Sequence, residues 1–307
     1  MKSVLPTLAL ATALPFSLAG CVIVDSQGHI TREEKRFTVS GTPELKLVTF
    51  DGAIEIRAGD GKTVVVEIEK RGPTKESTEE LKVESKQEGD RIEVEVKKPA
   101  HEVVFFGVGR MSPTAKLIVT MPRDGNVNAR SGDGSIRIEH VHGRLELKTG
   151  DGSIRAIDIA GQLTLSTGDG SVTLEDVSGD LDVDTGDGSV SVAGKLTTVK
   201  LHTGDGSITF RAAAGTAMKD DWSMTTGDGG IAIYLPSDFG AELDAHTGDG
   251  SIRNELDLKA EAEASDRDRD RERDRDRDRR TLKGKLGAGG KLLRIRTGDG
   301  SIRLKTS

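Results

Sequence analysis

The chain has 307 residues, a formal net charge of −7, 34% hydrophobic residues and only 3% aromatic residues, whereas glycine is abundant at 38 residues. Large rings normally dominate core energetics, so their scarcity argues against a thick core, an aromatic sugar cleft or a base-stacking platform. The net negative charge disfavours a nucleic-acid binder. A chain in which a third of the residues are apolar is too hydrophobic to be disordered. The composition therefore predicts a thin, glycine-punctuated fold.

The first twenty residues have the pattern of an export signal. Lys2 precedes an apolar run, Val4–Leu18, that two prolines interrupt and that is too short to span a membrane. The run ends in Leu18-Ala19-Gly20-Cys21, which resembles the lipobox of bacterial lipoproteins. That resemblance implies a signal peptide at 1–20, cleavage before Cys21 and acylation of its thiol, with 21–36 as the lipidated cysteine and a tether. The alternative is an ordinary signal peptide followed by a buried free thiol.

Cys21 is the only cysteine, so the chain has none left for disulfides or thiol catalysis. Several acyl chains on one residue hold a protein at a membrane far better than a single chain does. Val22 follows the cysteine where an aspartate would be expected for inner-membrane retention, and the resemblance to Gram-negative lipoproteins then implies the outer membrane. We expect a lipid-anchored protein of the cell envelope, on the periplasmic or the surface face.

Residues 37–122 are expected to form a β-rich cap. The segment Leu45–Ile54 holds an Asp-Gly turn between alternating residues and is interpreted as a degenerate repeat. Val64–Ile68, Ile92–Val96 and Lys116–Met121 alternate as strands do. Gly89-Asp90 predicts the turn of a hairpin that begins at Leu81 and continues into Ile92–Val96.

A pentapeptide of the form Thr-Gly-Asp-Gly-Ser recurs through residues 123–254 and once more near the C-terminus. Its eight copies begin at Ser131, Thr149, Thr167, Thr185, Thr203, Thr226, Thr247 and Thr297. The first four steps are each 18 residues, and the later ones are 23, 21 and 50. A fixed period of this length is typical of a stacked repeat architecture.

One repeat shows the expected fold. Leu163–Thr167 alternates as a strand, Gly168-Asp169-Gly170 forms a turn in which glycine supplies positive φ, and Ser171–Leu174 is a second strand. A second corner is expected at Val177–Gly179. Equivalent residues return at the same phase, which favours parallel stacking in a β-solenoid, with right-handed coils as the general preference. An all-β sandwich of hairpins is the alternative.

Residues 266–280 alternate arginine with acidic residues and have a net charge of +1. With nothing apolar to bury, this run predicts a disordered insertion at 255–281, rather than a segment that binds RNA or another charged chain. Residues 282–307 then complete the final coil that Thr247–Arg253 begins. Its cations, Arg294, Arg296, Arg303 and Lys305, would either protect an open solenoid end from aggregation or meet an acidic partner.

The aspartates of the repeats form the sharpest candidate site. Stacked at about 4.8 Å, neighbouring carboxylates repel one another, so something must offset the repulsion. We expect backbone N–H groups of each turn to do so, and a row of Ca²⁺ ions is the weaker alternative, since the nonapeptide of calcium β-rolls is absent. The calcium candidates are Asp133, Asp151, Asp169, Asp187, Asp205, Asp228, Asp249 and Asp299.

Two other sets of polar residues are candidates for a binding site. The threonines of the repeats share the parity of the leucines, which predicts inward hydroxyl ladders rather than an ice-binding face. His140 and His142, and likewise His202 and His246, form pairs that lack a third metal ligand, which favours solvated surface over a metal site.

The chain resembles the bacterial "putative adhesin" family of β-strand-repeat proteins over roughly 37–307. The resemblance rests on the Thr-Gly-Asp-Gly-Ser-Ile repeats, on Val119–Arg123 before them and on Gly287–Gly290 before the last copy. It implies an adhesin-like binding protein, in some members associated with envelope stress, and it carries over no catalytic residue. The outward positions Glu146, Thr164, Asp182 and Lys200 are mixed, and no catalytic spacing or phosphate loop is present.

These observations predict a non-enzymatic, lipid-anchored envelope scaffold without a cofactor. Its expected partners are the membrane, through Cys21, and an envelope protein or polysaccharide, but no nucleic acid. The alternatives are a polysaccharide-active β-helix enzyme and a calcium-binding structural module.

Overall fold

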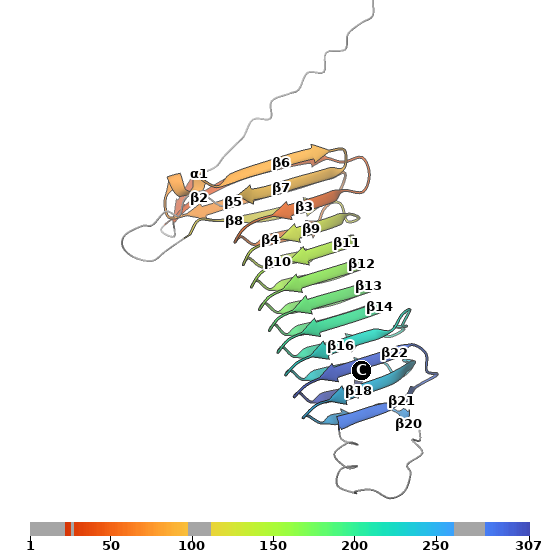
Figure 1. Cartoon of the computed structure of the whole chain (residues 1–307). Helices are drawn as coiled ribbons and strands as arrows, with labels where there is room; N and C mark the ends of the chain where they lie inside the picture. Colours follow the sequence, from red (N-terminus) through yellow and green to blue (C-terminus); the bar gives the residue numbers. More distant parts are fainter. Residues whose placement is uncertain (1–21, 26–27, 98–111, 261–279) are drawn as a thin grey trace, which may run out of the picture.

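The computed structural model describes residues 22–25, 28–97, 112–260 and 280–307, and these residues form an elongated stack of β-strands (Figure 1). The described residues include one short helix, α1 (Lys75–Glu79), which Thr74 and Ser77 close with a capping box. The expected all-β class is confirmed.

The 18-residue period sets the strand register in the middle of the stack. Three long strands, β12 (Ile154–Thr167), β13 (Val172–Thr185) and β14 (Val190–Thr203), run parallel, and Leu163 pairs with Leu181. The expected second corner lies within each long strand, as a bend. There Asp158 and Asp176 have φ of 52° and 53°, a left-handed conformation that aspartate tolerates better than most residues.

Each coil thus has one leg that leads into the Gly-Asp-Gly corner and one that leaves it, and these legs form an incoming and an outgoing ladder. In stacking order, the incoming ladder is β6 (Lys82–Glu88), β7 (Arg91–Lys97), β3 (Glu44–Val48), β9 (Asn126–Arg130), β11 (His142–Lys148), the second halves of β12 to β14, β16 (Trp222–Thr226), β22 (Leu292–Thr297), β18 (Ala241–Thr247), β21 (Thr281–Leu286) and β20 (Leu258–Ala260).

The outgoing ladder runs alongside it. In stacking order it is β1 (Val22–Asp25), β2 (Gly28–Thr38), β5 (Thr63–Gly72), β8 (Thr114–Met121), β4 (Ile54–Ala58), β10 (Ile136–Glu139), the first halves of β12 to β14, β15 (Ile208–Ala212), β17 (Ile231–Leu235), β23 (Ile302–Thr306) and β19 (Ile252–Asn254).

A single continuous core lies between the two ladders, because alternate residues of most strands point inward. Valine, isoleucine and leucine fill most of it. Trp222 is fully buried as its strand pattern predicts, with its ring centroid 5.3 Å from that of Phe210 and 5.5 Å from that of Phe239. Its indole N–H donates to the carbonyl of Thr197 at 3.1 Å. Trp222, Phe210 and Phe239 therefore form one aromatic cluster within the core.

The order of the coils in the stack differs from their order in the chain. Residues 282–307 do not form the last coil: β22 lies between β16 and β18 (Figure 1), and β23 lies between β17 and β19. At the other end, β3 and β4 lie in the same way between β7–β8 and β9–β10. The reason is that coils with the same corner and parity are interchangeable as neighbours, and the antiparallel return of β21 along β18 brings the chain back to the other side of β18.

One further expectation is corrected and another is confirmed. The segment 28–36 is not a tether, because β2 pairs antiparallel with β5 along its whole length, with Arg32 bonded to Glu69 at 2.7 Å. Cross-strand ion pairs replace the apolar alternation that would have revealed this strand. The predicted hairpin at Gly89-Asp90 is confirmed, as β6 and β7.

The ends of the incoming ladder are closed by antiparallel strands, β6 at one end and β20 and β21 at the other. The edge strand β6 is exposed and carries charges at Lys82, Glu84, Lys86 and Glu88, which discourage pairing with another chain. The cations of the C-terminal coil do not protect an open end, since that coil lies inside the stack.

Candidate functional site

The repeated corner is held together by its threonine rather than by its aspartate. The hydroxyl of Thr167 lies 2.9 Å from the carbonyl oxygen of Gly152 and 3.1 Å from that of Gly150, both in the preceding coil. Thr203 makes the equivalent contacts. Its hydroxyl also accepts a hydrogen bond from the N–H of Gly206, three residues further along the chain. The predicted inward hydroxyl ladder is confirmed, with every threonine of the column buried.

The glycines of the corner are required by close packing and not by positive φ. Glycines at positive φ lie elsewhere, for example Gly161 and Gly179 in the bends. A Cβ on Gly152 would lie 2.3 Å from the carbonyl oxygen of Gly134, and one on Gly170 would lie 2.1 Å from that of Gly152. Only glycine allows successive corners to approach this closely. This corrects the expectation that the corner glycines supply positive φ.

The eight aspartates of the column are all exposed. In the described part of the chain, none of these carboxylates accepts a hydrogen bond from the backbone of its own turn, in contrast to what we expected. Asp249 forms an ion pair with Arg280 at 3.2 Å. Solvent screening therefore limits the repulsion between neighbours. Over the described residues, no group of three or more His, Cys, Asp or Glu side chains is arranged to hold a metal ion, and calcium binding stays a hypothesis.

The histidine pairs are placed in different surroundings. His140 Nδ1 lies 2.8 Å from Asp158 Oδ2, to which Arg123 also donates at 2.9 Å. The hydrogen bond with His140, aided by the charge of Arg123, holds the pKa of Asp158 below its ordinary value. His142 faces Asp124 at 3.6 Å.

His202 and His246 do not approach each other. Both point outward on the incoming ladder, but β16 and the C-terminal strand β22 lie between their strands. His246 Nδ1 instead lies 2.9 Å from the hydroxyl of Thr281. The insertion of β22, which the sequence period does not reveal, therefore excludes a metal site shared by this pair.

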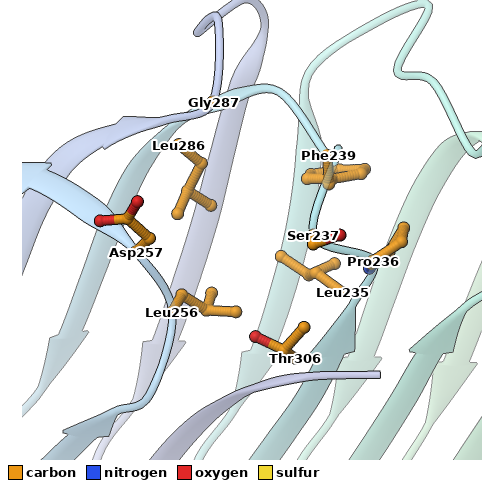
Figure 2. A pocket seen from close by; sticks show the side chains of 9 residues that line it. All are labelled: Leu235, Pro236, Ser237, Phe239, Leu256, Asp257, Leu286, Gly287 and Thr306. Carbon is orange, nitrogen blue, oxygen red and sulfur yellow. The ribbon is translucent and has the colours of Figure 1, made fainter.

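Figure 2 shows a small pocket lined by both polar and apolar groups, where the ends of β17, β21 and β23 meet. Its volume is about 70 Å³, little more than two water molecules at about 30 Å³ each. Its lining consists of Leu235, Pro236, Ser237, Phe239, Leu256, Asp257, Leu286, Gly287 and Thr306. Sequence reasoning missed this pocket, because its residues come from four separate segments and share no motif.

A second hollow, a groove of about 270 Å³ lined mostly by polar and charged residues, crosses β3, β7, β9 and β11 on the outer surface of the incoming ladder. Its polar groups largely satisfy one another: Asn128 donates to Glu146 at 2.7 Å, and the side-chain oxygen of Asn126 accepts from the N–H of Arg144 at 3.0 Å. Both hollows are smaller than the roughly 300 Å³ at which typical small-molecule pockets begin.

The titratable groups lack the mark of a general acid. Among the described residues the carboxyl groups with a perturbed pKa are Glu69, Glu76, Glu93, Asp158 and Asp180, and each pKa is lowered. A general acid at neutral pH needs a raised carboxyl pKa instead. Hydrogen bonds to surface arginine, histidine, threonine or backbone groups cause these shifts, so they reflect structural contacts.

The predicted lipidation site, Cys21, lies outside the described residues, as do residues 261–279 of the predicted disordered insertion. The ends of that predicted segment, 255–281, are ordered instead, because Leu258–Ala260 forms β20 and Thr281 begins β21. Within the described ranges no helix has the length and apolar character of a membrane span.

Residues 44–305 match the family model described as Toastrack DUF4097. The chain belongs to this family. The family resemblance noted from the repeats is thereby confirmed, and the match spans both terminal coils that are inserted into the stack. None of the curated proteins matches the sequence.

Solved structures of similar architecture share little sequence with this member of the Toastrack family. A "putative cell adhesion protein" of Clostridium sporogenes is 14% identical, with a TM-score of 0.30, and the alignment covers 90% of this chain and 100% of that one. A "putative lipid binding protein" of Parabacteroides distasonis is 14% identical, with a TM-score of 0.40 and coverage of 89% and 96%. A "putative adhesin" of Bacteroides fragilis is 12% identical, with a TM-score of 0.38 and coverage of 90% and 97%.

Proposed function

We propose that the protein is a non-enzymatic binding scaffold of the cell envelope, anchored to the outer membrane through a lipidated Cys21 and linked to envelope stress. The observation that carries the binding role is the contrast between the two sides of each strand. The inward residues repeat from coil to coil, as Leu163 and Leu181 do, whereas the outward residues beside them change.

The outward series in adjacent strands illustrates this contrast. Glu146, Thr164, Asp182 and Lys200 lie next to one another in register, and they differ in charge and size. A constant frame with a variable surface is the arrangement through which repeat proteins bind extended partners. An enzyme would instead need a convergent group of titratable side chains.

The anchor is supported by the Leu-Ala-Gly-Cys sequence and by the single cysteine. The described structure begins at Val22 with a strand, so the stack would lie close to the lipid rather than at the end of a long tether. The Cys21→Ala variant is expected to lose labelling by a radioactive fatty acid and to leave the membrane fraction.

A matched control restores a thiol outside the lipobox, as Cys21→Ala combined with Ser26→Cys, and should behave as the single variant does. Membrane sedimentation or fatty-acid labelling that persists in Cys21→Ala would overturn the anchor. The binding role is tested separately, with purified mature protein and isolated envelope polysaccharides and proteins. Retention without turnover supports the scaffold, and release of shortened glycan would replace it with the enzyme alternative.

A further inference from the structure

The inserted C-terminal coil assembles a basic surface that the chain order conceals. On the outgoing ladder β15, β17, β23 and β19 lie side by side, and their outward residues fall in two rows across the coils. Arg211, Tyr234 and Lys305 are consecutive partners in one row, and Arg303 and Arg253 are partners in the other. We call these five residues the basic face.

The cations of the basic face are open to a ligand. The three arginines are exposed. The guanidinium carbon of Arg211 lies 3.9 Å from the centroid of the Tyr234 ring, so this pair presents one flat, rigid unit. Lys305 is 3.4 Å from Glu255, an ion pair exposed enough for a stronger anion to replace.

Arg253 and Arg303 are neighbours that lack an ion-pair partner among the described residues. They are directly paired in the parallel ladder, about 4.8 Å apart, and neither forms an ion pair with any residue of the described ranges. Like charges at that spacing repel. An anion between them would relieve the repulsion, and bidentate contacts make arginine well suited to a carboxylate, sulfate or phosphate group.

The surroundings of the basic face fit a narrow ligand. Beyond Arg303 its row continues over the short side chains of Ala232 and Thr209. The exposed aspartates of the neighbouring corners, among them Asp249 and Asp299, precede Arg253 and Arg303 by four residues each. That acidic ridge disfavours a broad anionic bilayer but leaves room for a single chain that crosses the coils.

We propose that the basic face binds an anionic polysaccharide whose chain runs along the stacking axis. The coil spacing of about 4.8 Å is comparable to the length of one sugar residue in an extended chain, so successive acidic sugars meet successive coils. Arg253 on β19 and Arg303 with Lys305 on β23 bind the acidic groups at two neighbouring coils, and the Arg211–Tyr234 pair on the next two strands offers a flat surface to a sugar ring. This inference rests on the proposed binding role and names its partner class.

The test uses the full mature protein and a polyuronate, with neutral dextran as the uncharged control. The wild type should bind the polyuronate, lose affinity as salt is raised, and ignore dextran. Reversing two cations, Arg253→Glu with Arg303→Glu, should weaken binding at least about tenfold, because several ionic contacts set both the affinity and its salt dependence. Arg294→Glu is the matched control for the single reversal Arg303→Glu, since both make the same charge change on an exposed residue of the same coil, but Arg294 lies on the incoming ladder.

The double substitution to glutamine provides a second variant if charge reversal prevents folding, and far-UV circular dichroism verifies the fold of each. The inference is overturned if the wild type does not bind the polyuronate at low salt, if Arg294→Glu weakens binding as much, or if dextran binds equally well. Tighter binding to phosphatidylglycerol vesicles or single-stranded DNA through the same arginines would overturn the ligand class. A protein that ignores the polyuronate but retains another envelope component loses this inference and keeps the scaffold role.

Discussion

Substituting alanine for Gly170 is expected to destabilise the stack by about 1–3 kcal/mol. The new Cβ would lie 2.1 Å from the carbonyl oxygen of Gly152, whereas ordinary contact begins at 3.4 Å, so the two corners must separate by about 1.3 Å. Overpacking of this kind costs about 1–3 kcal/mol. Separation also stretches the hydrogen bond from Thr167 to Gly152, worth about 1 kcal/mol. Alanine also reduces the conformational freedom of the unfolded chain, which offsets about 0.4–1 kcal/mol of this loss in stability.

The assay is urea unfolding, followed both by the fluorescence of Trp222, the only tryptophan of the chain, and by far-UV circular dichroism. Asp169→Ala is the matched control, because its exposed side chain occupies the same corner, and its effect should stay within about 0.5 kcal/mol. A Gly170→Ala protein as stable as the control would refute the claim that backbone contact between coils demands glycine. Equal losses for both substitutions would assign a structural role to the carboxylate.

The threonine ladder predicts that Thr167→Val costs about 1–3 kcal/mol, because buried carbonyl groups lose their donor, while Thr164→Val on the outer side of the same strand stays within about 0.5 kcal/mol in the same unfolding assay. The hydrogen bond from Arg32 lowers the pKa of Glu69, despite partial burial. This contribution to stability is therefore present above the ordinary carboxyl pKa and is lost as the pH falls through the lowered one. Glu69→Gln and Arg32→Gln should each show a smaller loss of unfolding free energy between pH 6 and pH 3 than the wild type, and an unchanged loss would contradict the assignment. Because the column aspartates are exposed and unclustered, EDTA should leave the melting temperature unchanged; a fall that Ca²⁺ reverses would restore the calcium hypothesis.

The sequence period was sufficient to predict the strand register in the middle of the stack and the inward direction of the threonines. Leu163 and Leu181 are 18 residues apart, and that separation is also one turn of the coil. The order of the outer coils was not predictable in this way. Trp222 pairs with Leu293, across 71 positions of the chain, because identical corners offer each coil several equivalent neighbours.

The same limit explains what was missed at the candidate sites. The basic face needs Arg211 and Arg303 on neighbouring strands, and no local pattern connects them. The bends have aspartate at positive φ. A prediction that expects glycine at such positions does not find them. The strand β2 escaped detection because its outward and inward positions are mostly charged or polar, so that pairing with β5, rather than a core face, defines it.

The placement of the first and last coils inside the stack determines how a protein of this design can change in length. A repeat added beyond Thr306 would meet β19 and β18 already in position and would have no neighbour to stack on. Between β10 and β15, by contrast, each coil follows its predecessor directly, and an 18-residue duplication would insert one more layer without disturbing either end. The length of the stack is thus adjustable in single-coil steps from the middle, while the two ends stay constant.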